Sequence, residues 1–287
     1  MCINFSFIIP HKNSNDLLKR CVASIPKRDD VEIIIVDDNS YEPPCINYPG
    51  IKTVFLDTCH SKGAGHARNE GLKKARGKWV IFIDADDTYK VLFGDFLDKY
   101  KNADEDVIYF NYDEIHGDNI KANACLYCNS NDDNLNQFKM KYCLTVPWNK
   151  MVKRQFIVDN NIWFEECPVG NDIFYTYQIG YFAGNHTIIE PQSVYNYYIN
   201  TGSIIHKKKN DELYYLTIFY HIYQQNEFFT FLGDGKYRRT ILSKLTAILI
   251  KKGLSQFLLA VKVYFKHYSE IQKARYAYVN HFIKERE

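Results

Sequence analysis

The sequence lacks the apolar segments that would place a chain in or across a membrane. No run of about 18 apolar residues occurs in its 287 residues, so no membrane-spanning helix is predicted. Its first residues, MCINFSFIIPHKN, have neither the basic start nor the longer apolar stretch of a signal peptide. Both absences favour a cytoplasmic protein.

The chain also lacks the cysteine pattern of a disulfide-stapled secreted domain. Its eight cysteines are scattered along the sequence, which fits reduced thiols better than a disulfide framework. Cys125 and Cys128 form a CxxC, but no second CxxC or HxxxH follows to complete four zinc ligands. We therefore do not expect a structural zinc site.

A strong overall charge is missing as well, since the formal net charge is +2. The charge is uneven, because residues 233–287 carry twelve Lys and Arg against four Asp and Glu. This asymmetry indicates a basic tail that either meets an anionic surface or forms a solvated helical face, and no nucleic-acid partner is expected. What the chain has in abundance is aromatic residues, 23 Tyr and 19 Phe, within an otherwise ordinary globular composition.

Four apolar, β-branched runs predict strands, and two amphipathic segments between them predict helices. The expected strands are residues 5–10, 31–40, 51–57 and 78–84, and the expected helices are 13–25 and 65–76, the second closed by Gly77. Strands that read as continuous apolar runs and alternate with helices predict an α/β fold with a mostly parallel sheet and helices on both faces.

Acidic residues follow two of these strands. Asp37 and Asp38 end the second, and Asp84, Asp86 and Asp87 end the fourth. A single Asp there often caps a turn or a helix, but two groups at the carboxyl edge of one sheet favour a ligand site. A D-x-D at a strand end suits Mg²⁺ or Mn²⁺ held together with substrate phosphates.

Other readings of the acidic motif are weaker. A calcium loop starting at Asp84 would need Gly and Glu where the chain has Tyr89 and Asp95. VIFIDADDT also fits the DxDxT of phosphatases resembling the haloacid dehalogenase family, in which Asp84 would be a covalent nucleophile, although three strands precede it here. GAGHAR, residues 63–68, lacks the third glycine of a dinucleotide-binding fingerprint.

The segments FSFIIPHKN, IIIVDDNS, SKGAGHARNEG and VIFIDADD occur in this order, followed by VPWNKMVKRQFI and VGNDIFYTYQI. In these motifs the chain resembles the family 2 glycosyltransferases with the GT-A fold, up to about residue 205. The resemblance implies a Rossmann-like catalytic domain at 1–205, with a nucleotide-binding half at about 1–100 and an acceptor half at 101–205. A helical C-terminal extension at 206–287 would follow.

The resemblance also implies roles for residues on the nucleotide side of the site. Pro10 and His11 would line the nucleotide pocket, and Asp38 would accept a hydrogen bond from the base, commonly uracil. Asp37 would shape the turn, and Arg68, in the ARN element, would help to hold the nucleotide or else form a surface ion pair.

For the reaction itself, the resemblance implies that Asp84 and Asp86 contact the ribose and a metal-bound diphosphate, with Asp86 the preferred ligand of Mn²⁺ or Mg²⁺. Asp172, in GNDIFY, matches the base that takes the proton of the acceptor hydroxyl. Asn171 stands where the family often has a second acid. Asp172 could instead cap the helix that follows it.

Two further residues have open roles on the acceptor side. Trp148 could stack on an acceptor sugar or be buried by packing, and His206 could reach the metal or the phosphates. After residue 211, apolar residues recur at helical spacing among lysines. Such helices could lie on an anionic membrane surface, pack on the catalytic domain or contact a second subunit.

Together these features predict an inverting, metal-dependent glycosyltransferase. It would move a sugar from a nucleotide-diphosphate sugar, with UDP as the expected nucleotide, to a hydroxyl of a glycan or lipid-linked acceptor in surface polysaccharide synthesis. It would be cytoplasmic, with peripheral contact at the inner face of the membrane as an added possibility. A non-catalytic nucleotide-sugar-binding partner, kept open by Asn171, and the phosphatase are the alternatives.

Overall fold

The computed structural model describes residues 2–44, 52–57, 61–124, 133–167, 169–199, 212–271 and 273. The chain forms two compact units: Met1–Glu166 with Asn171–Asn200, and Cys167–Gly170 with Thr201–Glu287. The CxxC of Cys125 and Cys128 lies outside the described residues, and so does His206.

One half of the sheet in the first unit is parallel. Its strands are β1 (Phe5–His11), β2 (Val31–Asp37), β3 (Lys52–Asp57) and β4 (Trp79–Phe82), in the spatial order β3-β2-β1-β4. All seven residues of β2 are buried, as expected for a strand covered on both faces. The carboxyl ends of β1, β2 and β4 therefore meet at one edge of the sheet.

The other half of the sheet is mixed. Its strands are β5 (Thr88–Tyr89), β6 (Val107–His116), β7 (Asn119–Lys121), β8 (Lys150–Lys153) and β9 (Thr187–Tyr198). The full order is β3-β2-β1-β4-β8-β6-β9-β5, and β7 pairs with β6. β8 is antiparallel to both β4 and β6, while β6 and β9 are parallel.

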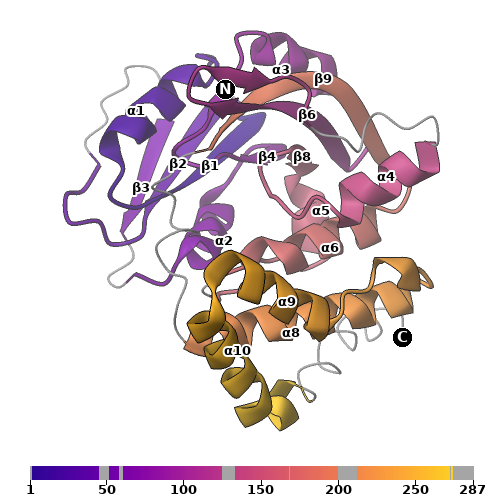
Figure 1. The fold of residues 1–287 in the computed structure, drawn as a ribbon. Helices are drawn as coiled ribbons and strands as arrows, with labels where there is room; N and C mark the ends of the chain where they lie inside the picture. Colours follow the sequence, from indigo (N-terminus) through magenta and orange to yellow (C-terminus); the bar gives the residue numbers. More distant parts are fainter. Residues whose placement is uncertain are drawn as a thin grey trace. The chain divides into compact units, whose positions relative to one another are not determined.

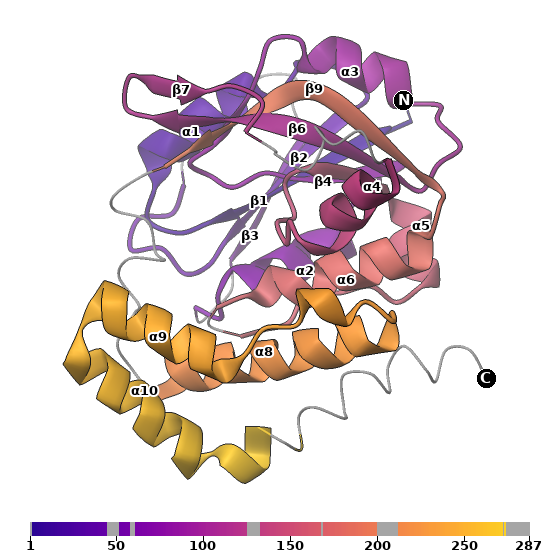
Figure 2. The ribbon, with the colours of Figure 1, turned by 45° about the vertical axis from the view of Figure 1, so that its right-hand side comes forward.

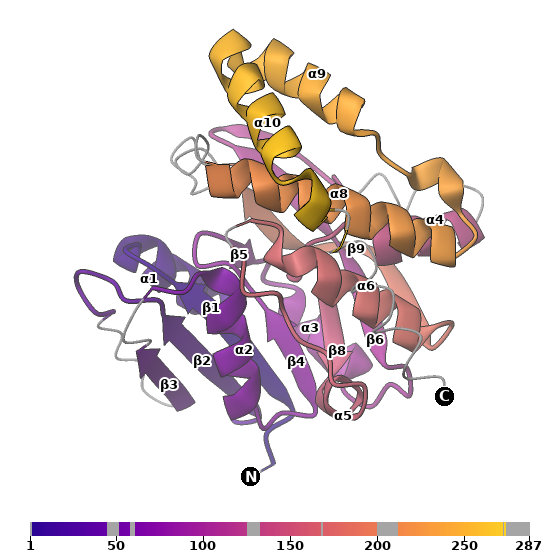
Figure 3. The same cartoon turned by 90° about the horizontal axis from the view of Figure 1, so that it is seen from below.

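Helices cover both faces of this sheet. Those described are α1 (Asn15–Ser24), α2 (Ala64–Lys74), α3 (Phe93–Tyr100), α4 (Asp133–Tyr142), α5 (Arg154–Asp159) and α6 (Asn171–Ala183). Figures 1 and 3 show α2 and α6 on one face and α1 and α3 on the other. The predicted α/β architecture is confirmed.

The predicted end of the second helix is wrong. α2 ends at Lys74, and Ala75 already has extended backbone angles of φ −62° and ψ 135°. Gly77 lies instead against β1, where a Cβ would come within 2.7 Å of the Ser6 backbone nitrogen. The glycine is thus needed for the close approach of two backbones, not for ending a helix.

The second unit is helical, which confirms the expectation of C-terminal helices. It contains α8 (Glu212–Phe231), a 3₁₀ turn η2 (Gly235–Tyr237), α9 (Ile241–Lys252) and α10 (Leu254–Lys266), with α10 turning back beside α9 and α8 (Figure 2). Its core consists of Tyr215, Phe219, Ile222, Ile248, Ala260, Val263 and Ile271. Within the described residues, no helix combines the length and apolar character needed to cross a membrane.

Candidate functional site

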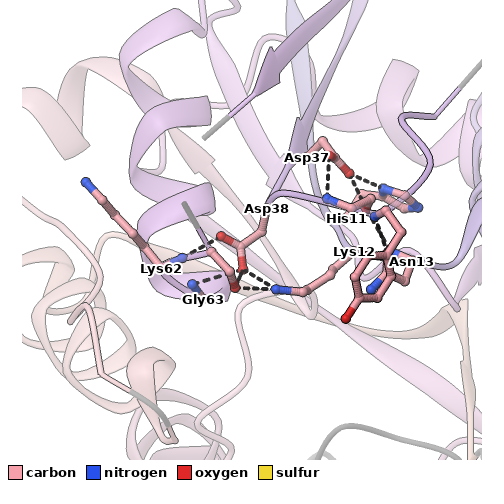
Figure 4. Close-up of polar contacts among 10 residues, drawn as sticks. His11, Lys12, Asn13, Asp37, Asp38, Lys62 and Gly63 are labelled. Carbon is pink, nitrogen blue, oxygen red and sulfur yellow. Dashed lines mark hydrogen bonds and ion pairs between the residues drawn. The ribbon is translucent and has the colours of Figure 1, made fainter. Parts of the chain in front are cut away.

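The end of β1 is joined to the end of β2 by a buried histidine (Figure 4). His11 Nδ1 lies 2.7 Å from Asp37 Oδ1, and its Nε2 accepts a hydrogen bond from the Ser14 backbone N–H at 3.2 Å. Because Nε2 accepts, the ring proton lies on Nδ1 and is donated to Asp37. Pro10 is partly exposed and lies beyond the part of β1 that pairs with β4, so its missing N–H costs no bond on that side.

Asp37 shapes the turn after β2, as expected. Its carboxylate accepts bonds from the Ser40 backbone N–H at 2.9 Å and the Ser40 hydroxyl at 2.5 Å. Burial acts to raise the pKa of Asp37, but the hydrogen bonds from Ser40 and His11 outweigh it and leave the pKa lowered. Asp37 is therefore an ionised anchor for the turn.

Asp38 holds the segment before α2. Its Oδ1 accepts from the Lys62 N–H at 2.7 Å, and its Oδ2 accepts from the Gly63 N–H at 3.0 Å and the Ser61 hydroxyl at 2.7 Å. Lys12 Nζ lies 3.7 Å from the same Oδ2 (Figure 4). Asp38 is only 5% exposed. Through these hydrogen bonds it positions residues 61–63 at the edge of the sheet.

The acids after β4 form a tight turn. The Asp87 N–H donates to the Asp84 carbonyl at 3.0 Å, and Arg20 donates to the Asp86 carbonyl. The Arg20 guanidinium also lies 3.9 Å from the centre of the Tyr198 ring. Asp84 and Asp86 stay partly exposed, whereas Asp87 is fully buried.

Asp87, for which no role was predicted, connects this turn to β9. Its Oδ2 accepts from the Tyr195 hydroxyl at 2.6 Å, and its Oδ1 accepts from the Tyr198 N–H at 2.8 Å. Burial raises the pKa of Asp87 well above its usual range, and the charges of Asp84 and Asp86 raise it further. Asp87 is thus a buried support of the turn and not one of its accessible carboxylates.

A divalent cation fits this turn. Asp84 and Asp86 offer carboxylate oxygens, the donor type that Mg²⁺ and Mn²⁺ prefer. Both side chains are accessible to a ligand, and a cation between them would offset the repulsion of two neighbouring carboxylates. The donor set of this chain is thus compatible with the metal that the motif predicts.

Arg68 brings the acidic turn together with the start of α6. Its Nη2 donates to Asp84 Oδ1 at 2.7 Å, and its Nη1 donates to Asn171 Oδ1 at 2.8 Å. The Arg68 side chain is 7% exposed, and its guanidinium lies 5.4 Å from the ring centre of Phe164. The alternative of a surface ion pair for Arg68 is therefore wrong.

Asp172 is the second residue of α6, inside the first helical turn and not before it. A carboxylate there is stabilised in its ionised form by the helix dipole. Lys150 of β8 is 1% exposed and donates to the Val146 carbonyl. Burial lowers the pKa of Lys150 to about 7, against the opposing effect of the Asp172 charge, so the lysine and the carboxylate interact electrostatically.

Trp148 lies in an aromatic cluster. It is 4% exposed and stacks in parallel on Tyr195 and Tyr197, with ring centres 4.6 and 5.2 Å away, and its edge contacts Tyr112. Of the two roles that the sequence left open, this structure displays burial by packing. Tyr195 thereby connects the Trp148 cluster to Asp87.

Sequence reasoning missed Arg20, Lys150 and Tyr195. Arg20 and Tyr195 carried no local signal, because their partners lie 66 and 108 positions away. For Lys150 a signal existed, since Met151 and Val152 follow it in WNKMV, and a lysine in such a segment would be buried if the segment formed an interior strand.

Known sequences that match this chain point to glycosyltransferases. The model of Glycosyl transferase family 2 matches residues 6–156. The uncharacterized glycosyltransferase YibD of Escherichia coli (strain K12) is 29% identical over 73% of this chain and 66% of its own length. The putative glycosyltransferase EpsH of Bacillus subtilis (strain 168) is 24% identical over 70% of this chain and 62% of its own length. The matched part of this chain thus covers slightly less than two thirds of the length of these two relatives.

Solved structures share the fold. A crystal structure of S. aureus TarS residues 1–349 in complex with UDP-GlcNAc has a TM-score of 0.58 at 19% identity, covering 98% of this chain and 89% of that one. The mannosyltransferase PcManGT from Pyrobaculum calidifontis, in complex with GDP-Man and Mn²⁺, has a TM-score of 0.56 at 14% identity, covering 99% and 86%. These matches confirm the predicted GT-A fold. Because the family model covers more than half of the sequence, the chain belongs to glycosyl transferase family 2.

Proposed function

We propose that this protein is an inverting glycosyltransferase that uses a UDP-sugar and a divalent cation. The observation that carries the proposal is the position of Arg68, which contacts both Asp84 and Asn171. This one side chain ties the acidic turn, suited to a metal and a diphosphate, to the first turn of α6, which contains Asp172. Donor and acceptor chemistry would meet at that junction.

On the donor side, Pro10, His11 and Asp38 would line the nucleotide pocket at the carboxyl ends of β1 and β2. The His11–Asp37 bond joins the ends of the two strands, and residues 61–63, held by Asp38, would form the opposite wall. Related folds that contain UDP-GlcNAc and UDP support UDP as the nucleotide.

Asp86, with Asp84, would hold Mn²⁺ or Mg²⁺ against the diphosphate. A bound cation supplies Lewis-acid stabilisation of the charge that develops on the leaving phosphate. Arg68 would remain on Asp84 and keep its carboxylate oriented. The Mn²⁺ in the PcManGT complex supports this assignment.

Asp172 would act as the general base. As the acceptor oxygen bonds to the anomeric carbon, the bond from that carbon to the diphosphate oxygen breaks on the opposite side, and the acceptor proton passes to Asp172. Attack opposite to the leaving group inverts the anomeric configuration. Asp172 lies in the first turn of α6, where the helix dipole favours a negative charge.

The acceptor is proposed to be a glycan or lipid-linked hydroxyl in surface polysaccharide synthesis. This rests on the names of relatives, such as the poly(ribitol-phosphate) beta-glucosyltransferase of Bacillus spizizenii and the succinoglycan biosynthesis protein ExoO of Rhizobium meliloti. We assign catalysis to residues 1–205, with a nucleotide half at about 1–100 and an acceptor half at 101–205, and place the protein on the cytoplasmic side.

The test is a panel of nucleotide sugars assayed for hydrolysis with and without Mn²⁺. We expect UDP release from one UDP-sugar, its loss in EDTA, and a fall of about a hundredfold or more in Asp86→Ala and Asp172→Asn. Calorimetry should show that Asp172→Asn still binds UDP with Mn²⁺. Asp95→Asn, in the first turn of α3, is the control and should behave as wild type.

Three outcomes would contradict the proposal. Binding of UDP with Mn²⁺ but no turnover of any donor, with any acceptor tried, would indicate a non-catalytic binding partner. Phosphate release without a nucleotide, together with an acyl-phosphate on Asp84, would indicate a phosphatase. Full activity of Asp172→Asn would exclude that residue as the base.

A further inference from the structure

The helices α9 and α10 each carry two apolar faces. One face packs into the core of the second unit through Ile248 of α9 and through Ala260 and Val263 of α10, which are at most 4% exposed. A helix that only covered this core would be polar on its remaining surface. These helices depart from that pattern.

The second apolar face is open to solvent. On α9 it includes Leu242 and Ile250, which are 73% and 77% exposed, and on α10 it includes Leu254, Leu258 and Phe265, which are 56–71% exposed. Positions 254, 258 and 265 recur at helical spacing on one side of α10. Exposed apolar residues gathered in this way, instead of scattered singly, mark an interaction surface.

Two of the most exposed side chains flank the turn between the helices. Ile250 and Leu254 stand on either side of Gly253, whose φ of 84° makes the sharp change of direction. The end of α9 and the start of α10 therefore form an apolar corner, here called the α9–α10 corner and defined as residues 249–258. Leu249 and Leu258 complete its exposed apolar side chains.

The corner itself carries only positive charge. Residues 241–266 contain five lysines and no acidic residue, and the last of these lysines, Lys266, is paired with Glu212 of α8. Lys251 lies within the corner and Lys262 follows on α10, and both are exposed. An apolar helix face bordered by lysines is the combination that lies in the headgroup region of an anionic bilayer.

A second copy of the chain is a poorer occupant of the same surface. Pairing two such corners would bring two sets of lysines together without acidic partners, and the whole 233–287 segment has twelve basic residues against four acidic ones. Like charges brought together across an interface oppose association. Anionic lipid complements the charge and accepts the apolar side chains at the same time.

We propose that the α9–α10 corner binds an anionic membrane surface, with Ile250 and Leu254 entering the headgroup region and the lysines contacting anionic headgroups. The proposal does not depend on the catalytic one, because neither helix carries a residue assigned to the site. It would bring the protein to a lipid surface through α9 and α10.

The experiment is sedimentation of the full chain with vesicles of phosphatidylcholine, with and without phosphatidylglycerol. We expect binding to the mixed vesicles, weaker binding to the neutral ones, and release by salt. Lys251→Glu/Lys262→Glu should weaken binding at least thirtyfold, since each lost lysine alone accounts for about fivefold. Ile250→Ser/Leu254→Ser should weaken it at least tenfold.

Two controls keep the result specific. Val91→Ser removes an exposed valine of the first unit, and Lys74→Glu reverses an exposed charge on α2; both should bind as wild type. Circular dichroism shows whether the corner variants keep their helices. Binding that is equal on neutral and mixed vesicles, or unchanged in the corner variants, would overturn the proposal. So would a lipid-free dimer that Ile250→Ser/Leu254→Ser dissociates, because the surface would then join two copies.

Discussion

Lys150 gives the first unit a pH-dependent stability that a single substitution should remove. Burial lowers the pKa of Lys150 from 10.5 to about 7 in the folded chain. Between these values the unfolded chain binds more protons than the folded one, so the free energy of unfolding rises with pH. The slope is about 1.4 kcal/mol per pH unit. The penalty for the buried charge is complete below about pH 7 and is on the order of 5 kcal/mol.

Lys150→Met tests this magnitude, because methionine has a similar length and volume but no ionisable group. All three tryptophans, Trp79, Trp148 and Trp163, belong to the first unit. Urea unfolding followed by their fluorescence therefore reports on that unit alone. We expect the variant to be more stable than wild type at pH 7, and the difference to shrink by about 1.4 kcal/mol for each pH unit up to pH 9.

Lys74→Met is the matched control, because Lys74 is an exposed lysine of α2 in the same unit. Its stability should follow that of wild type at every pH. The reasoning is refuted if Lys150→Met and wild type show the same dependence of unfolding free energy on pH. That result would mean that the amine of Lys150 keeps its ordinary charge in the folded chain, through water or a partner that compensates it.

Three further substitutions test the site and its support. Tyr195→Phe keeps the ring but leaves a buried oxygen of Asp87 without its donor. Urea unfolding should show a loss of about 1–3 kcal/mol in the free energy of unfolding, and a loss below about 0.5 kcal/mol would contradict the assigned hydrogen bond. Gly77→Ala should lower the free energy of unfolding by about 1–3 kcal/mol, because the added Cβ would meet backbone atoms of β1. Gly94→Ala, with open space around it, is the control and should be neutral or slightly stabilising, so equal effects of the two substitutions would contradict the close approach at Gly77. Arg68→Lys keeps the charge but not the fork that reaches two partners, so kcat/KM for donor hydrolysis should fall about tenfold or more, and an unchanged value would argue against the bridge.

The parallel half of the sheet could be predicted because its signal is local. β1 and β2 are predominantly apolar runs, and the acids Asp37 and Asp84 lie at the carboxyl ends of two of the predicted strands. The mixed half has weaker signals. β8 has four residues and lies between β4 and β6. Its Val152 pairs with Val80 of β4, 72 positions earlier, and with Val107 of β6, 45 positions earlier. Such long-range pairing depends on the packing of the whole unit, which a short segment does not encode.

The acidic turn was predicted as a group, and the D-x-D spacing with the family resemblance assigned roles to Asp84 and Asp86. Asp87 received no role, because its burial and its contacts could not be predicted from its position in the sequence. Asp87 faces β9 and is held by Tyr195 and Tyr198, while Asp84 and Asp86 remain accessible. The third acid thus supports the turn on which the other two are presented.

Asn171 shows how a departure from the family pattern can follow from its surroundings. Its Oδ1 accepts from Arg68, a residue 103 positions earlier that also pairs with Asp84. An acid at position 171 would compete with Asp84 for the single positive charge of Arg68 and add another negative charge beside Asp172. A neutral amide accepts the same hydrogen bond and leaves the charge of Arg68 for Asp84. Asn171 therefore preserves the link between the acidic turn and α6 without a second carboxylate, which is why its presence is compatible with a working base at Asp172.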